Sequence, residues 1–299
     1  MTARGSSTSS DTGTPNSRSA TELRAVPSRT TTLRRRSAVA SGFGNIDVTE
    51  QNGVYTIEVG RLDDATHEGL SRVFRAAHES SADVVVVTGK DRSFLNPMNY
   101  DIEWVKRLAV YDDMLKIFKE AEDIVRDIIN CEKPTIAKVY APGAHSLGAS
   151  IALACDFVVA ADDATFSDPH LSGFGVVPGD GGSLVWPTRI GLGRAREFLM
   201  LDRIATAQEA LDIGLINRSV PADRLDAEVD VMVAKLRSYD QVGVRFSKKW
   251  LNQYMRHSMN VTGMGSLFAE GMVFSHADFA KKVEDYAKLL EEQGGYSEA

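Results

Sequence analysis

The stretch from Lys133 to Pro187 constrains the fold of this chain more than any other feature. Apolar runs at Thr135–Tyr140 and Phe157–Ala161 predict two buried strands, and the intervening Gly148–Cys155 predicts a helix rich in alanine and leucine. A turn of small residues opens that helix. The first N–H groups of a helix lack intrahelical acceptors and carry the positive end of its dipole, so the turn predicts a place for a negatively charged oxygen.

Two histidines and an aspartate stand in or beside the loops of this stretch: His145 in the turn, His170 in Asp-Pro-His, and Asp180 in Pro-Gly-Asp-Gly-Gly. Imidazole and carboxylate groups transfer protons. An anion site beside them is typical of enzymes whose reactions pass through an enolate or a tetrahedral oxyanion. Structural alternatives stay open, because His145 can bond a loop carbonyl and Asp180 can cap the following helix. The pattern predicts an enzyme.

The rest of the chain predicts an α/β protein. Ile46–Gly60 alternates apolar and polar residues across an Asn-Gly step, which indicates a hairpin, and Asp64–Ser80 predicts an amphipathic helix. Val84–Thr88 predicts a strand buried on both faces, and Ile102–Cys131 one long helical region. This order implies right-handed crossovers and a mostly parallel sheet. Further helices are expected at Gly193–Met200, Thr206–Ile213, Ala222–Tyr239, Val242–Arg256 and onward to Glu292.

Composition divides the chain into three regions. Residues 1–41 are rich in Ser, Thr and Arg and poor in aromatic residues, so we expect a disordered tail, with an organelle transit peptide as the alternative. Residues 42–200 are expected to form the α/β core. Residues 201–299 are expected to form a helical region that serves as a separate layer or makes subunit contacts.

Charge and hydropathy exclude several classes of protein. The net charge of -7 argues against a general nucleic-acid binder, and no apolar window is long enough to predict a membrane span or a secretory signal. Cys131 and Cys155 lie in apolar helical contexts without paired spacing, which predicts buried thiols rather than a disulfide or a zinc site. We expect a soluble cytoplasmic protein whose partners are a small molecule and other copies of the chain.

Several segments together carry a family resemblance: KPTIAKVYAPGAHSLGASIALACDFVVAADDATF, VVPGDGGSLVWP and FSKKWLN, in this order and at matching separations. From about Ile46 onward the chain resembles the crotonase superfamily, which includes the enoyl-CoA hydratases and isomerases. The resemblance implies a crotonase-like spiral of ββα units with a helical C-terminal trimerisation region, assembled as a homotrimer or a dimer of trimers. It also implies an oxyanion hole formed by the backbone N–H groups of Met98 and Leu147. Pro97 departs from the family's Gly-containing loop and puts the Met98 donor in doubt.

The two catalytic glutamates of the hydratases are both absent, because Ser150 and His170 occupy their positions. Hydration by paired carboxylates is therefore not expected. The Asn96 loop, Asp-Pro-His and VVPGDG resemble a branch typified by 6-oxocamphor hydrolase and related β-diketone hydrolases. That branch implies His170 as the base and Asp180 as the carboxylate that orients it. In the leading hypothesis below, His145 returns a proton to the carbon. The residues expected to line the substrate pocket are Asn96, Trp186 and Glu270.

The leading hypothesis is retro-Claisen hydrolysis of a β-dicarbonyl substrate through an enolate, without a cofactor or a metal. One alternative is an enoyl-CoA hydratase or isomerase, in which Lys248 and Lys249 meet the phosphates of a thioester substrate; those lysines otherwise form a solvated cationic face. Another is a non-catalytic assembly protein with the same fold. Four histidines without motif support are expected at the surface: His67, His78, His257 and His276.

Overall fold

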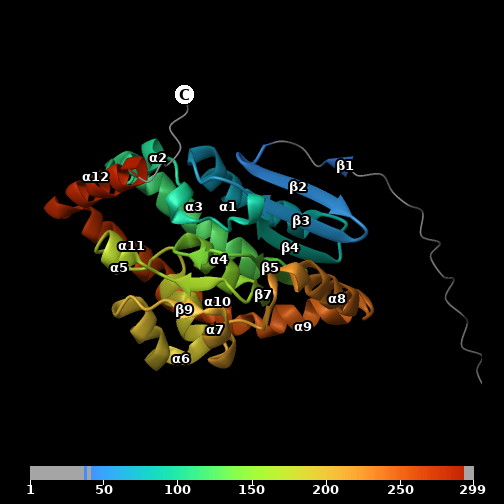
Figure 1. Ribbon diagram of the computed structural model, residues 1–299. Coiled ribbons are helices and arrows are strands. Elements are labelled where there is room, and N and C mark those ends of the chain that lie inside the picture. Colours follow the sequence, from blue (N-terminus) through green and yellow to red (C-terminus); the bar gives the residue numbers. More distant parts are fainter. Residues whose placement is uncertain (1–36, 39–41, 293–299) are drawn as a thin grey trace, which may run out of the picture. The chain divides into compact units, whose positions relative to one another are not determined.

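The computed structural model describes residues 37–38 and 42–292, which belong to a single unit, Arg34–Ala299 (Figure 1). The tail predicted over residues 1–41 lies outside the described residues except for Ser37–Ala38. Those two residues form β1, which pairs antiparallel with β2. None of the described helices is long and apolar enough to cross a membrane.

The predicted hairpin is formed by β2 (Ile46–Gln51) and β3 (Val54–Val59). Asn52 and Gly53 both adopt positive φ values, 50° and 72°. A two-residue hairpin turn of the type favoured by the strand twist needs positive φ at both positions, and Asn-Gly supplies it at little steric cost. The hairpin prediction is confirmed.

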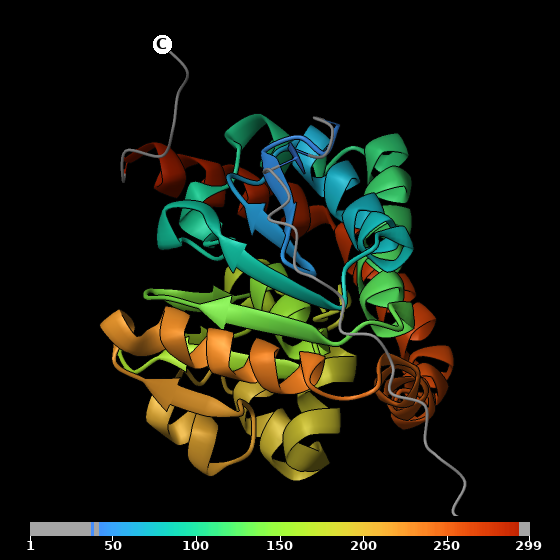
Figure 2. The ribbon, with the colours of Figure 1, turned by 90° about the vertical axis from the view of Figure 1, so that its right-hand side faces the viewer.

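The main sheet has the strand order β1-β2-β3-β4-β5-β7-β10. It is antiparallel up to β3 and parallel from there to its other edge. Every residue of β4 is buried, which confirms the prediction of a strand covered on both faces. Helix α8 (Leu225–Arg237) lies against β4, β5 and β7 (Figure 2). The remaining strands of this sheet are β4 (Val84–Gly89), β5 (Thr135–Val139), β7 (Phe157–Ala161) and β10 (Arg218–Val220).

A second, three-stranded sheet is formed by β6 (Gly143–His145), β8 (Thr165–Ser167) and β9 (Ala205–Thr206). Strands β6 and β8 are parallel, and His145 stands opposite Ser167 at their ends. Two loops that the sequence analysis singled out therefore begin side by side. One leads into helix α4 (Leu147–Ala154), and the other leads to His170.

The helical region predicted over Ile102–Cys131 is two helices rather than one, α2 (Ile102–Arg107) and α3 (Tyr111–Asn130). Residues 108–110 separate them and contain neither glycine nor proline, so the sequence carries no local signal for the break. The predicted helix over Asp64–Ser80 is α1 (Asp64–Glu79), capped by Asp63, and it packs against α3. The other helices up to Met200 are α4 (Leu147–Ala154), α5 (His170–Gly173) and α6 (Gly182–Met200).

The C-terminal region is mainly helical, but it also supplies β9 and β10 to the two sheets. Its last helices do not form a separate layer, because α11 packs against α3 and α12 against α2 (Figure 1). Because α11 and α12 pack back onto the core, their side chains lie beside the loops that follow β4 and β8. The helices are α7 (Ala207–Asp212), α8 (Leu225–Arg237), α9 (Gln241–Leu251), α10 (Gln253–Ser258), α11 (Met264–Phe274) and α12 (Ala277–Glu292).

Candidate active site

A cavity of about 380 Å³ lies where these elements meet, and its lining is mostly apolar. The N-terminal part of the chain contributes α1 and the loop after β4, and the middle contributes the start of α4 and the loop after β8. Helices α11 and α12 close it from the C-terminal side. The polar residues in the lining include His67, Asn96, Tyr100, His145, Ser146, Ser167, His170, Asp180, Glu270 and Tyr286.

His170 is the centre of a buried group of titratable side chains. Its Nδ1 is hydrogen-bonded to Asp168 Oδ1, and its Nε2 lies 3.5 Å from Asp180 Oδ2 and 3.9 Å from Glu270 Oε1. Asp168 directly follows β8, and His170 begins α5, so two short elements fix the pair. The prediction that Asp180 orients the imidazole is corrected in one respect: Asp168 holds Nδ1, and Asp180 faces the other nitrogen.

The loop Gly179–Gly182 brings the Asp180 carboxylate close to His170, because the neighbouring glycines have no side chains that would intervene. A Cβ atom on Gly182 would lie 2.0 Å from Asp168 Oδ2, and one on Gly179 would lie 2.3 Å from Glu270 Oε2. Asp180 itself accepts a hydrogen bond of 3.1 Å from Ser150 Oγ. Ser150, which the family resemblance places at the first hydratase glutamate position, therefore anchors a carboxylate.

The close packing of charges shifts the protonation of each group. Burial alone would lower the pKa of His170, but Asp168 and Asp180 outweigh it and raise that pKa well above its usual range. Burial raises the pKa of Asp168 although His170 opposes the shift. Burial would also raise the pKa of Asp180, but His170 and the hydrogen bonds lower it. Burial, opposed by His170, raises the pKa of Glu270 to about 8. At neutral pH the unliganded site therefore holds a protonated imidazole and a neutral Glu270.

His145 lies in the same cavity but is neutral at neutral pH. Burial lowers its pKa against an opposing hydrogen bond with the Pro142 carbonyl. Its Nδ1 lies 2.7 Å from Ser167 Oγ, and its Nε2 lies 3.4 Å from Thr165 Oγ1. A neutral imidazole with hydroxyl partners is a weaker proton donor than Glu270.

The two expected oxyanion donors differ in availability. Leu147 is the first residue of α4, and the described residues offer its N–H no acceptor. The preceding Ser146 has φ 50° and ψ −128°, a conformation that non-glycine residues rarely adopt. The Met98 N–H, by contrast, donates to Asn96 Oδ1 at 3.0 Å. The expected donor at Met98 is thus already paired.

Pro97 does not disrupt its loop. It occupies the first position of a short 3₁₀ helix, Pro97–Asn99, where a proline is tolerated because its missing N–H would have no partner there. Asn96 caps this helix with the same oxygen that receives the Met98 N–H. Asn96 lines the cavity as expected, with its side-chain oxygen engaged locally.

Three of the predicted site residues lie elsewhere. Trp186 is fully buried and stacks on Phe198, with ring centroids 5.3 Å apart, so it belongs to the core. Lys248 is also buried, which contradicts both a phosphate contact and a solvated face; its Nζ lies 2.7 Å from Asp156 Oδ2. Lys249 pairs with Glu132 at 2.7 Å. Neither lysine lines the cavity.

His67 was expected at the surface and is instead 2% exposed. Its Nδ1 lies 2.6 Å from Glu120 Oε2, and the ring lines the cavity. A signal was present in the sequence, because His67 shares the buried face of α1 with Leu70 and Phe74 at helical spacing. Glu120 and Asp168, which were not predicted, show their roles only through contacts made in the folded chain.

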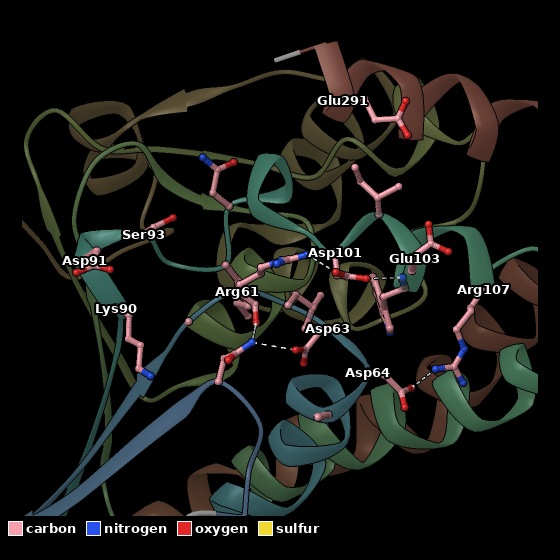
Figure 3. Close-up of a pocket in the computed structure, with 18 residues that line it drawn as sticks. Arg61, Asp63, Asp64, Lys90, Asp91, Ser93, Asp101, Glu103, Arg107 and Glu291 are labelled. Carbon is pink, nitrogen blue, oxygen red and sulfur yellow. Dashed lines mark hydrogen bonds and ion pairs between the residues drawn. The ribbon is translucent and has the colours of Figure 1, made fainter. Parts of the chain in front are cut away.

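A larger cleft of about 1180 Å³ adjoins the cavity, and Asn96 and Trp104 line both (Figure 3). Carboxylates outnumber cations in its lining, and the cations have carboxylate partners. The ion pairs are Arg61–Asp101, Arg107–Asp64 and Lys90–Asp47. The lining carboxylates are Asp63, Asp64, Asp91, Asp101, Glu103 and Glu291. Within the described part of the chain, no group of three or more metal-binding side chains is arranged to hold a metal ion.

A buried imidazole is held by one carboxyl group and faced by two others, in the same cavity as a first-turn N–H for which the described residues offer no acceptor. This arrangement is typical of acid–base enzymes. Residues 51–291 match the model of the enoyl-CoA hydratase/isomerase family. The chain therefore belongs to this family, within the crotonase superfamily, and the expected crotonase fold is confirmed. It is a crotonase-family enzyme, so the hypothesis of a non-catalytic assembly protein is not retained.

Several relatives carry hydratase names. The chain is similar to a crotonyl-CoA hydratase of Syntrophomonas wolfei, with 30% identity over 203 residues, 67% of this chain and 75% of that one. Among solved structures it is similar to an enoyl-CoA hydratase/isomerase from Mycobacterium paratuberculosis, with a TM-score of 0.74, 29% identity, and coverage of 81% and 98%. A β-diketone hydrolase from the cyanobacterium Anabaena shares the fold, with a TM-score of 0.72, 23% identity, and coverage of 78% and 95%.

Proposed function

We propose that the cavity activates water with His170 and holds the resulting oxyanion or enolate at the Leu147 N–H. One observation carries this proposal: His170 lines the cavity with Nδ1 held by Asp168, while Nε2 lies 3.5 Å from Asp180 and 3.9 Å from Glu270. An imidazole fixed on one nitrogen and available on the other is the arrangement that a general base needs. The base is the neutral form of His170, so the protonated form must first lose a proton.

The first candidate reaction is hydrolysis of a C–C bond in a β-dicarbonyl compound. Neutral His170 takes a proton from water while the oxygen bonds to one carbonyl carbon. The tetrahedral intermediate releases a carboxylic acid as the C–C bond breaks, and the enolate oxygen stays at Leu147. Neutral Glu270 gives its proton to the enolate carbon. His170, 3.9 Å from Glu270, then passes the water proton to it and restores both groups.

The charge of the adjoining cleft supports this candidate. Coenzyme A carries several phosphate groups, and anions of that kind bind best beside cations that have no other partner. The cleft has an excess of carboxylates, and Lys248 and Lys249 are paired away from the cavity. A compact dicarbonyl compound without phosphates suits these surroundings.

The second candidate is hydration or isomerisation of an enoyl-CoA thioester, and the comparisons favour it more directly than the first. The family description and the names of the two enoyl-CoA relatives given above refer to enoyl-CoA chemistry. The same groups serve the hydration: His170 deprotonates water as it adds to the β-carbon, Leu147 holds the thioester enolate, and Glu270 protonates the α-carbon. The paired glutamates of the hydratases are absent, which weakens this candidate.

A panel of cyclic β-diketones and enoyl-CoA esters separates the two candidates. Purified protein is assayed for acid release from the diketones and for loss of the absorbance of the conjugated thioester. Acid released from a diketone without coenzyme A supports the first candidate, and loss of the thioester absorbance supports the second. His170→Ala should abolish the activity that is found. Full turnover in that variant, with Lys249→Met as a folded control, contradicts the proposed base.

A further inference from the structure

A connected row of aromatic rings lines the cavity and takes no part in the proposed proton transfers. The rings come from α3, from the residue that follows α5, and from α11 and α12, so distant parts of the chain contribute to one surface. We call this set the aromatic wall, and its members are Phe118, Phe174, Phe274, Phe279 and Tyr286.

Each ring of the aromatic wall meets the next. Phe118 stacks on Phe274 with ring centroids 5.3 Å apart, and Phe274 stacks on Phe279 at 4.2 Å. Phe174 lies 6.3 Å from Phe279 and meets Tyr286 edge-on at 4.8 Å. Rings packed against one another in this way restrict each other's motion. The aromatic wall is therefore formed before a ligand binds, which reduces the entropy lost on binding.

The aromatic wall offers a ligand carbon atoms rather than polar groups. Its one polar side-chain atom is the Tyr286 hydroxyl, which donates to the Pro97 carbonyl at 3.0 Å and thereby ties α12 to the loop after β4. Every member except Phe279 is half-buried, whereas core rings such as Phe74 and Phe166 are fully buried. The aromatic wall thus keeps apolar surface that a ligand can cover.

The aromatic wall begins one helical turn from two acid–base groups. Phe174 follows His170 by four residues, and its N–H donates to the His170 carbonyl at 3.2 Å. Phe274 follows Glu270 by four residues on α11. Residues four apart in a helix share a face, with Cβ atoms about 5–6 Å apart. A substrate whose reacting carbonyl lies beside His170 and Glu270 therefore places its next few carbons near Phe174 and Phe274.

The volume of the cavity limits the size of that part of the substrate. At about 30 Å³ for each water-sized group, the 380 Å³ of the cavity hold on the order of a dozen non-hydrogen atoms. A hydroxyl or a charge placed against the rings would lose its hydration and find no partner in the aromatic wall. Size and polarity together favour a small hydrocarbon group.

We propose that the aromatic wall determines specificity by binding an apolar hydrocarbon group of roughly six to ten carbons attached to the reacting carbonyl. Phe174 and Phe274 are specificity-determining residues of this surface and take no part in proton transfer. This inference rests on the proposed function and makes it more specific: the substrate is a compact carbonyl compound in which the atoms beyond the reacting group are mostly carbon.

Binding of two matched monoketones tests the inference without depending on turnover. The probes are 4-tert-butylcyclohexanone and 4-(2-hydroxypropan-2-yl)cyclohexanone, which have equal numbers of non-hydrogen atoms and differ by one methyl replaced with a hydroxyl. In calorimetric titrations of the wild-type protein, we expect the tert-butyl probe to bind about tenfold or more tightly, because an apolar pocket rejects a hydroxyl in place of a methyl by such factors. Equal affinity, or no measurable binding of the tert-butyl probe, overturns the inference.

A change of preferred size assigns the specificity to Phe174. Phe174→Ala enlarges the cavity, so it should shift the affinity ratio by about tenfold from 4-tert-butylcyclohexanone towards the larger 4-cyclohexylcyclohexanone, which a general loss of stability would not do. Phe174→Leu keeps much of the apolar surface and should retain most of the wild-type ratio. Phe268→Ala makes the same change at a ring of α11 that is 72% exposed and should leave the ratio unaltered. A wild-type ratio in Phe174→Ala overturns the inference.

A spectroscopic measurement covers the case in which Phe174→Ala fails to fold. In deuterated wild-type protein carrying protonated, ¹³C-labelled phenylalanine, the tert-butyl protons of the bound probe should give nuclear Overhauser effects to Phe174 or Phe274. Contacts to neither ring overturn the inference. Turnover is scored separately, because neither candidate reaction consumes a monoketone. Selective binding of the tert-butyl probe without cleavage of any β-diketone or turnover of any enoyl-CoA ester therefore contradicts the proposed function and leaves the aromatic wall standing.

Discussion

Glu270 Oε1 lies 3.9 Å from Nε2 of His170, although one residue is on the C-terminal helix α11 and the other begins α5. The contact exists because α11 folds back over the cavity that the loops of the core leave open. It places a neutral carboxylic acid beside a protonated imidazole. The protonation states in the site therefore depend on helix α11 as much as on the stretch Lys133–Pro187.

The first prediction concerns pH. The neutral form of His170 is the base, and its pKa is raised, so kcat/KM should rise with pH as that proton is lost. Glu270 must be protonated, and its pKa is about 8, so the rate should fall above that pH. Because His170 and Glu270 interact, the rise and the fall of kcat/KM belong to the pair rather than to either residue alone. The pH profile should be bell-shaped with its maximum at alkaline pH. Glu270→Gln cannot protonate the enolate carbon, so it should lower kcat/KM and remove the alkaline limb from the residual rate; a wild-type profile that is flat from acid to alkaline pH contradicts both assignments.

The second prediction concerns Asp168. In Asp168→Asn the amide donates to Nδ1 of His170, which moves the imidazole proton to Nε2 and removes the base. We expect kcat/KM to fall by about 10²- to 10⁴-fold, the usual contribution of general acid–base catalysis. Asp163→Asn makes the same change at an exposed position of the turn before β8 and should leave the rate unchanged. Equal activity of the two variants would show that Asp168 does not hold the base.

The third prediction concerns close approach in the glycine-rich loop. A Cβ on Gly182 would lie 2.0 Å from Asp168 Oδ2, so Gly182→Ala should displace that carboxylate. We expect activity to fall and the free energy of unfolding to drop by about 1–3 kcal/mol, as in other overpacked sites. Gly193→Ala lies on the same helix with no heavy atom near the added Cβ. It should be neutral or stabilising by up to about 1 kcal/mol in denaturant titrations, because alanine favours helix.

The fourth prediction separates the two lysines of FSKKWLN. Lys248→Met leaves Asp156 partly buried without its partner, so the free energy of unfolding should fall by about 3–5 kcal/mol. Lys249→Met removes a more exposed pair with Glu132 and should cost no more than about 1 kcal/mol. Chemical denaturation measures both. A change in KM for an enoyl-CoA ester without a loss of stability would instead favour a phosphate contact at Lys248.

The fifth prediction concerns assembly, which we propose to involve α9 and the helices that follow it. Large apolar side chains are exposed along this face: Phe246, Trp250, Leu251, Tyr254 and Phe268. An exposed patch of this kind marks a protein contact more often than a solvated surface. The double substitution Trp250→Glu with Tyr254→Glu should therefore lower the mass measured by light scattering. A monomeric wild-type protein contradicts the proposal, and Val231→Glu on α8 is the control.

Much of the fold was predictable because it depends on local signals. Asn52-Gly53 sets the hairpin, the run of valines sets β4, and Thr206 caps α7 by accepting the Glu209 N–H at 3.2 Å. The break between α2 and α3 was not predictable, because residues 108–110 have ordinary helical propensities. Their conformation is decided by contacts with elements that are distant in the sequence, and local propensity is too weak to oppose those contacts.

The candidate site, too, was only partly predictable from the sequence. The motifs marked His170 and Asp180, Glu270 was expected only as a pocket residue, and the structure brings all three together. They did not mark Asp168 as the partner of Nδ1, nor the pairing of His67 with Glu120. A motif shows which groups are available but not their distances, and hydrogen bonding requires contact within a few ångström.

The sequence by itself determined the hairpin, the buried strands β4, β5 and β7 with the helices between them, the turn that opens α4, and several of the chemical groups that the cavity can use. Only the tertiary structure decided which carboxylate holds each imidazole nitrogen, that the Met98 N–H is already bonded to Asn96, and that Lys248 is a core residue. The physical reason is that local structure follows from backbone sterics and side-chain periodicity along the chain, whereas protonation and pairing follow from distances between segments that meet only on folding.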